Sequence, residues 1–254
     1  MPVRIYGTCR DLPDHRDHRW EAPRAHLPRR VDLRSQCPPV YNQGPLNSCS
    51  ANALGAAIWF EARKNDREAA GPSRMFIYYN ERSIERHPRC NVPVSLRNGH
   101  KTLARLGTCH ERQWRYKFGN FSVRPPKGCY QAALGQRVAR YARVKRDLRQ
   151  LRGCLAHGFP FTMGMSVYAS FESRGVRETG RVPMPASDER LLGGHAVMVV
   201  GYDDKTERFI VRNSWGTRWG MGGYCLLPYE FVLDERRYAW DFWTILGLTD
   251  RVIE

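Results

Sequence analysis

Asn213-Ser-Trp-Gly-Thr-Arg-Trp-Gly-Met-Gly-Gly-Tyr224 is the stretch that decides the fold, because chance rarely places two Trp and their glycines in this order. Two more fragments belong with it, one around Cys49 and one around His195. Together the fragments supply a thiol at Cys49, an imidazole at His195 and side-chain amides at Gln43 and Asn213. These are the groups that an activated thiol nucleophile with an oxyanion donor requires.

The order and context of these residues resemble the papain-like cysteine peptidases, from about Val31 to Leu246. The resemblance implies an α+β fold of two lobes, one mainly helical and one β-rich and barrel-like, with the active site in the cleft between them. It also implies the roles of four residues. Cys49 would be the nucleophile, His195 the base, Asn213 the residue that orients His195, and Gln43 an oxyanion-hole amide.

The residues that follow Cys49 favour a helix that begins at the thiol. The run from Ser50 to Lys64 is rich in helix formers, and Arg63 and Lys64 lie at its carboxyl end, where cations are favoured. A helix N-terminus and a nearby imidazolium both lower the pKa of a thiol. The sequence therefore predicts a thiolate at Cys49.

The pairing of His195 with Asn213 follows from a predicted hairpin. Residues 195–202 and 209–215 have the length and composition of strands, and the residues between them favour a turn. A hairpin centred on Asp204 would place position 195 directly opposite position 213, with Cβ atoms about 5 Å apart. The Asn213 amide could then fix the tautomer of the imidazole.

The domain organisation divides at residue 30. Residues 1–30 form a charged N-terminal arm, and residues 31–254 form the peptidase-like domain, with a helical lobe at about 31–135 and a β-rich lobe at about 136–254. The arm is shorter than the long helical propeptide of papain-like zymogens. Two readings of it stay open: a solvated tail, or a segment that packs on the body near the cleft.

The middle of the chain carries weaker patterns. Residues 72–82 and 96–106 favour helices, the second capped by Ser95, residues 140–155 form a basic helical pattern, and residues 161–168 favour a strand. Gln113-Trp-Arg-Tyr116 resembles a Trp-Pro-Tyr segment of the family.

Three residues depart from the family pattern around the nucleophile. Leu46 replaces a half-cystine that staples the loop, Asn47 replaces a Gly, and Ser50 replaces a Trp. The pair of glycines that commonly bonds an extended substrate has no evident counterpart.

Composition restricts the remaining possibilities. With eight Cys, no C-x-x-C pair and no signal-peptide pattern after the first Met, we expect reduced thiols. The location stays open: a cytoplasmic protein is the default, and export by another route is the alternative. No apolar stretch is long enough to span a membrane. We expect no cofactor and no metal, because the spacing of His87, Cys90, Cys109 and His110 supports a zinc site poorly.

The net charge of +16 could attract acidic partners, but the basic residues are dispersed, so nucleic acid is not the expected partner.

These observations predict a monomeric cysteine endopeptidase that acts on proteins or peptides. Three alternatives stay open. The same groups could transfer an acyl group to an amine or deamidate a side chain. The chain could be a catalytically weak papain-like protein that binds peptide or nucleic acid. It could also be a basic scaffold that binds nucleic acid without thiol reactivity.

Overall fold

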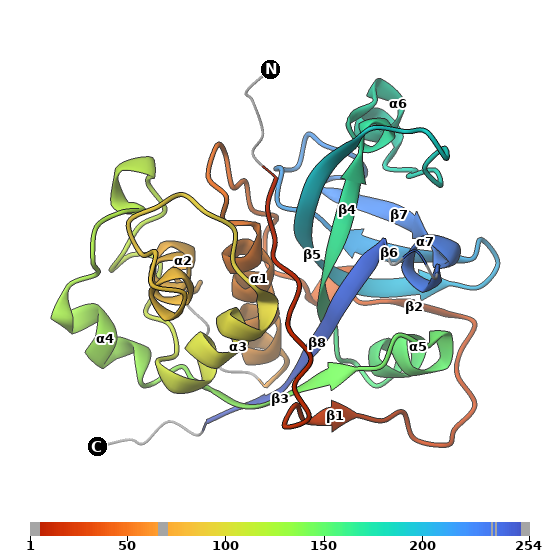
Figure 1. Ribbon diagram of the computed structural model, residues 1–254. Coiled ribbons are helices and arrows are strands. Elements are labelled where there is room, and N and C mark those ends of the chain that lie inside the picture. The colour runs from red at the N-terminus through yellow and green to blue at the C-terminus, as the bar shows by residue number, and fades with distance from the viewer. Residues whose placement is uncertain (1–5, 66–70, 235, 237, 250–254) are drawn as a thin grey trace.

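Helices and strands separate into two lobes in the computed structural model, with the N-terminal arm running between them (Figure 1). The structure describes residues 6–65, 71–234, 236 and 238–249. No helix among these residues is long and apolar enough to cross a membrane.

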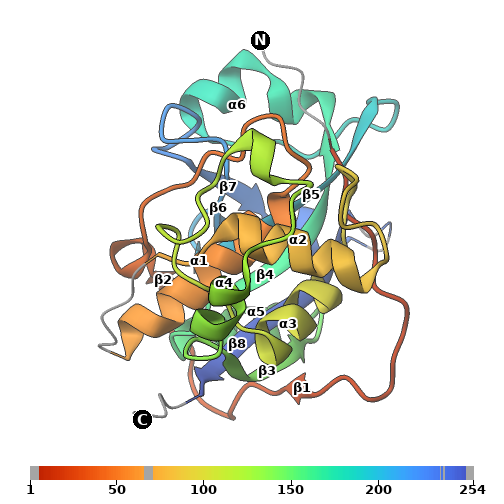
Figure 2. The ribbon, with the colours of Figure 1, turned by 90° about the vertical axis from the view of Figure 1, so that its left-hand side faces the viewer.

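The helical lobe is built around α1 (Cys49–Lys64), whose side chains are buried along most of its length. Against it pack α2 (Arg74–Ile84) and α3 (Leu96–Arg105), in front of the sheet in Figure 2. The short α4 (Lys127–Ala133) packs on α2 through Phe76. The Ser73 and Ser95 hydroxyls accept hydrogen bonds from the backbone N–H groups three residues later, which caps α2 and α3. The helices predicted after Cys49 and after Ser95 are therefore confirmed.

The second lobe is an open, mainly antiparallel sheet in the order β1-β3-β8-β4-β5-β6-β7, with β2 paired to β5. The strands are β1 (Arg19–Trp20), β2 (Arg30–Asp32), β3 (Val138–Val144), β4 (Phe161–Tyr168), β5 (Leu191–Asp203), β6 (Arg208–Arg212), β7 (Tyr224–Pro228) and β8 (Ala239–Leu248). Three helices accompany them: α5 (Leu148–Ala156), α6 (Arg174–Thr179) and α7 (Tyr229–Leu233). Short 3-10 turns cover Arg34–Gln36, Phe118–Asn120 and Ala169–Glu172.

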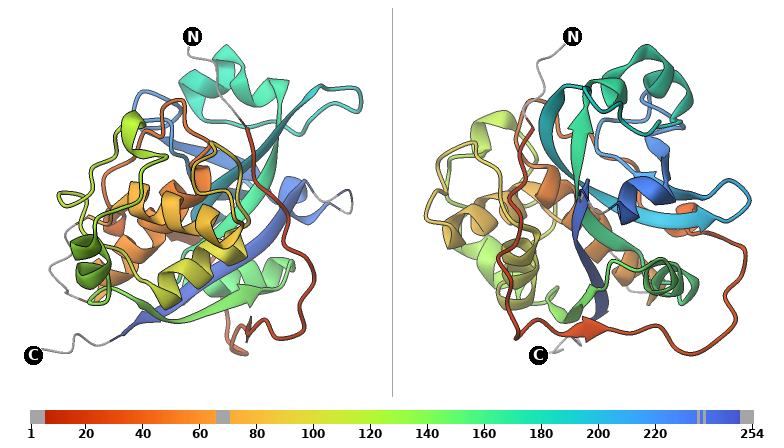
Figure 3. Two further views of the ribbon diagram at one scale, coloured as in Figure 1. Left: turned by 60° about the vertical axis from the view of Figure 1, so that its left-hand side comes forward. Right: turned by 45° about the vertical axis from the view of Figure 1, so that its right-hand side comes forward.

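The arm follows the boundary between the two lobes until β1 pairs with β3 in parallel (Figure 3). Farther along, the Ala22 N–H donates to Gln150 on α5 at 2.7 Å. Of the two readings of the arm, the packed one therefore describes residues 6–22.

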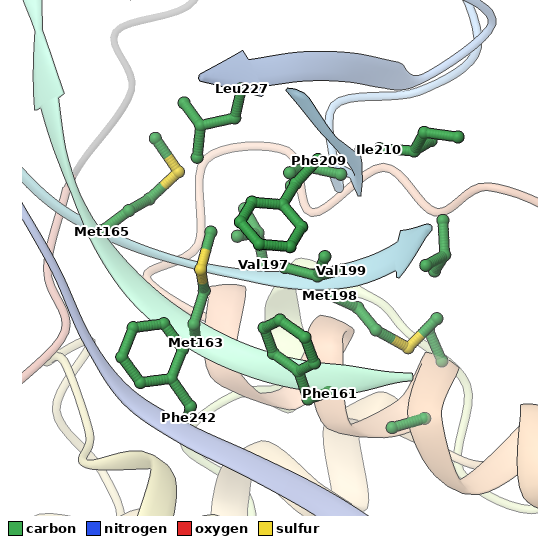
Figure 4. Packing of buried hydrophobic residues seen from close by; sticks show 14 of the residues in the cluster. Phe161, Met163, Met165, Val197, Met198, Val199, Phe209, Ile210, Leu227 and Phe242 are labelled. Carbon is green, nitrogen blue, oxygen red and sulfur yellow. The ribbon is translucent and has the colours of Figure 1, made fainter. Parts of the chain in front are cut away.

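The core of the sheet lobe forms between β4, β5, β6 and β8 (Figure 4). Phe161 and Met163 on β4 share a face because alternate residues of a strand point the same way. The Phe161 ring lies 6.3 Å from that of Phe209 on β6 and 6.0 Å from that of Phe242 on β8. This layer packs against β5, the strand that carries His195.

The helix predicted over residues 140–155 is wrong in its first half. Residues 138–144 form β3, which pairs with β8, and the helix α5 starts only at Leu148, capped by Asp147. Basic residues such as the exposed Arg140 lie between the buried residues Val138, Ala142 and Val144. The apolar pattern of the strand was therefore not recognised in the sequence. Pairing with a distant strand overrides the local helical pattern.

All eight cysteines are free, and only Cys9 and Cys90 are exposed. Among the described residues, no group of three or more His, Cys, Asp or Glu side chains could hold a metal ion.

Candidate active site

Cys49 is the first residue of α1, as the sequence predicts, and its side chain lies against β5. Its thiol is 2% exposed and packs with Ala196, the residue after His195. The backbone N–H of Ala196 and those at the start of α1 lower the pKa of the thiol, but burial dominates and raises it to about 12. The Cys49 thiol is therefore protonated here, and it donates to the Gly7 carbonyl oxygen at 3.5 Å.

His195 and Asn213 meet in a buried pair. His195 Nε2 lies 2.8 Å from Asn213 Oδ1, and the two residues are 1% and 2% exposed. An amide oxygen only accepts, so Nε2 carries the proton and Nδ1 is left as the basic nitrogen. The Trp215 ring lies 5.1 Å from the imidazole and shields the pair from water.

The register predicted for this pair is wrong. Near the site, Met198 pairs with Arg212 and Val199 with Val211, so position 213 would face 197 rather than 195. Asp203 pairs with Arg208, so the turn is centred between positions 205 and 206 rather than on Asp204, and a bulge follows Val199. His195 and Asn213 still meet because positions 195 and 197 share one face of β5 and the diagonal is within reach of their side chains.

Gln43 is held by the residue that follows Asn213. Its backbone N–H donates to the Ser214 carbonyl at 2.9 Å, and the Ser214 hydroxyl donates to Gln43 Oε1 at 2.6 Å. One hydrogen of Nε2 goes to the Leu46 carbonyl at 2.9 Å. The other hydrogen of the NH₂ group is the one that could bind an oxyanion. Sequence reasoning missed Ser214, although it lies inside the deciding stretch.

The residues that depart from the family pattern are all buried. Leu46 is 2% exposed and packs in the core where the family carries a half-cystine. The Asn47 N–H donates to Asn91 Oδ1 at 2.8 Å. The Ser50 hydroxyl donates to Glu81 on α2 at 2.6 Å, so a hydrogen bond joins α1 and α2 where the family places a Trp ring.

The arm covers this site. The Tyr6 ring lies 6.5 Å from that of His195 and 6.1 Å from that of Trp215. A Cβ atom at Gly193 would lie 2.6 Å from Tyr6 Cβ, so the glycine permits the close approach of the arm. Thr8 Oγ1 donates to the Val94 carbonyl at 3.2 Å, on the helical side of the site. The arm thus bridges the two lobes over Cys49.

Charged groups anchor the arm beyond the site. Asp17 accepts two hydrogen bonds from Arg97 on α3, at 3.0 and 2.6 Å. Arg143 on β3 forms ion pairs with Asp17, Asp11 and Asp241. The backbone N–H of Asp11 also donates to Asp241 at 2.6 Å. The composition of the arm gave no sign of these partners.

Comparisons with known proteins agree with this geometry. Residues 27–231 match the model of the papain family of cysteine proteases. A peptidase C1-like protein of Acanthamoeba polyphaga mimivirus is 41% identical over 221 residues, which cover 84% of this chain and 71% of the relative. A cathepsin B-like protein of Giardia intestinalis is 28% identical over 233 residues, which cover 85% of this chain and 69% of the relative.

The fold agrees as well. Xylellain, a cysteine protease from Xylella fastidiosa, superposes with a TM-score of 0.89 at 40% identity, over 96% of each chain. The family model and the 41% identical relative each cover most of the chain. The chain therefore belongs to the papain family of cysteine proteases.

Proposed function

We propose that the chain is an endopeptidase in which Cys49, His195, Asn213 and Gln43 carry out the chemistry. Membership of a protease family makes proteins and peptides its substrate class. The observation that carries the proposal is the buried hydrogen bond between His195 and Asn213. Ala196, the residue after His195, packs against Cys49, and Ser214 orients the Gln43 side chain. An imidazole and two side-chain amides are the groups that a thiol nucleophile of this kind needs.

The reaction has two covalent steps. His195 takes the thiol proton through Nδ1, and the sulfur attacks the peptide carbonyl carbon. The oxyanion that forms is stabilised by the Cys49 N–H and by the free hydrogen of the Gln43 amide. The C–N bond then breaks as His195 returns the proton to the leaving amine. Water, deprotonated by His195, cleaves the remaining thioester and releases the acid.

The path of the arm supports cleavage inside a chain rather than at its ends. The arm passes the Cys49 sulfur as an extended segment, with Tyr6 beside His195 on one side and Thr8 and Cys9 beside residues 94 and 95 on the other. A groove that holds an extended chain on both sides of the thiol suits an endopeptidase. Substrate and residues 6–9 compete for one place, so the arm must leave before turnover.

Labelling with an epoxysuccinyl peptide tests the proposal. We expect modification at Cys49 alone, mapped by mass spectrometry, and its loss in His195→Ala. Gln43→Ala should lower kcat at least about 10²-fold, the cost of losing one oxyanion donor. Absence of labelling in a chain whose arm has been removed would contradict the proposal. Products formed with and without an added amine would reveal acyl transfer.

A further inference from the structure

The loop that carries Gln43 is held by a hydrogen-bonded tyrosine. Gln43 and Ser48 are joined by Gly44, Pro45, Leu46 and Asn47, and Gly44 has a left-handed φ of 58°. This is the loop in which Leu46 stands where the family carries a half-cystine. The Tyr116 hydroxyl donates to the Gln43 carbonyl at 2.8 Å and is also bonded to the Ser48 hydroxyl. One phenol oxygen therefore contacts both ends of the loop.

The direction of each hydrogen bond in this contact is fixed. A carbonyl can only accept, so the single proton of Tyr116 goes to Gln43, and the Ser48 hydroxyl donates to the Tyr116 oxygen. Ser48 Oγ accepts in turn from Asn52 Nδ2 at 3.1 Å. Asn52 Oδ1 accepts from the Arg74 guanidinium at 3.1 Å. The chain of donors runs from a cation to the Gln43 backbone, and bonds in such a chain polarise and strengthen one another.

The phenol ring is held as firmly as its hydroxyl. The Arg74 guanidinium lies 4.1 Å from the centre of the Tyr116 ring and 4.3 Å from that of the Tyr41 ring. The backbone N–H of Tyr116 donates to Glu111 at 2.7 Å. Burial raises the pKa of the Tyr116 phenol, which keeps it protonated as a donor.

We propose that Tyr116 is a positioning residue for the oxyanion hole: its hydroxyl fixes the Gln43 backbone relative to the start of α1 and so sets the place of the Gln43 amide relative to the Cys49 N–H. This non-covalent contact restrains the loop that lacks the half-cystine. The inference rests on the proposed function, because it assigns a partner to the oxyanion donor of that reaction. Tyr116 touches neither substrate nor thiol in this role.

The test compares two reactions of Cys49 in the full-length chain. Turnover of a peptide amide forms an oxyanion, whereas alkylation by iodoacetamide makes a C–S bond and breaks a C–I bond without one. For Tyr116→Phe we expect kcat to fall about tenfold, part of the 10² to 10³ that loss of a donor costs, with KM within about twofold. The alkylation rate should equal that of the wild type. Tyr130→Phe is the matched control, since its hydroxyl also bonds an amide oxygen, on Asn80, in the same lobe.

A double-mutant cycle separates a positioning role from a merely structural one. If Tyr116 acts through Gln43, Tyr116→Phe should change kcat by less than about twofold in a Gln43→Ala background. A tenfold loss that persists in that background, an equal loss in alkylation, or an unchanged kcat in Tyr116→Phe would each overturn the inference. Ser48→Ala, which breaks the other bond, should show the same pattern if the Phe variant does not fold.

The cycle also separates this inference from the proposed function. A wild-type chain without turnover, whose alkylation is unaffected by His195→Ala, would defeat the proposed function. Turnover that depends on His195 and Gln43 but not on Tyr116 would defeat only the role given to Tyr116.

Discussion

Replacing Asp17 with Asn should release the arm from the candidate active site. The Asp17 carboxylate accepts two hydrogen bonds from Arg97, and both side chains are about one-tenth exposed, at 11% and 8%. Arg143 lies 3.3 Å from the same carboxylate. Asp17 therefore ties the arm to both lobes at once. The amide of Asn has nearly the same shape but no charge.

The size of the effect follows from these bonds. A hydrogen bond to a charged group contributes about 1.5 to 3 kcal/mol, and Asn keeps one acceptor, so we expect docking of the arm to weaken by about 2 kcal/mol. Since about 1.4 kcal/mol corresponds to a factor of ten, the fraction of molecules with an open arm should rise about 30-fold. Arg97 returns to water when the arm leaves, so the open state is unaffected.

Alkylation of Cys49 by iodoacetamide measures this fraction, because the buried thiol reacts only when Gly7 moves away. We expect the rate at Cys49, mapped by mass spectrometry at neutral pH, to rise about 30-fold in Asp17→Asn. Asp14→Asn is the control, because Asp14 pairs with Arg16 of the arm itself at the surface. An unchanged rate in Asp17→Asn, or an equal rise in the control, would refute the assignment of Asp17 as the anchor.

Three further predictions concern stability and thiol access. Burial and the Asp11 charge raise the pKa of Asp241 to about 6, so its contribution to stability is present below pH 4 and is lost as the pH rises through 6. In thermal unfolding, Asp241→Asn should be as stable as the wild type at pH 4 and more stable than the wild type above pH 6, by about 3 kcal/mol. Gly99→Ala should lose about 1 to 3 kcal/mol in urea unfolding, because its Cβ would lie 2.1 Å from a Leu54 methyl. A chromogenic disulfide reagent should react quickly with only the two exposed thiols, Cys9 and Cys90, and its slower reaction at Cys49 should speed up about 30-fold in Asp17→Asn.

The residue types of the site could be predicted from the sequence, but their exact geometry could not. Cys49 at the head of α1 follows from the run of helix formers, which is a local property of the chain. The partnership of His195 and Asn213 follows from their chemistry. Their register does not, because it depends on where the turn is centred and on a bulge after Val199, and no residue pattern in the sequence indicates either.

The position of the arm could not be predicted for a different reason. A charged segment with few apolar residues is typical of a solvated tail, and that reading is reasonable when its partners are unknown. Here the carboxylates of the arm meet Arg97 and Arg143, which lie 80 and 126 residues farther along the chain from Asp17. Pairing at such separations appears only in the folded molecule.

The state of Cys49 shows which of two opposing effects is larger. The helix N-terminus favours the thiolate by about 0.3 to 1 kcal/mol, and by about 2 kcal/mol at most. Burial raises the pKa of the thiol from 9.0 to about 12, which corresponds to about 4 kcal/mol in favour of the protonated form. The effect of burial is therefore the larger one, and the thiol stays protonated while Gly7 covers the sulfur. Departure of the arm readmits water and ends the bond to Gly7, so under the proposed mechanism this movement also restores the conditions in which α1 and His195 would stabilise a thiolate.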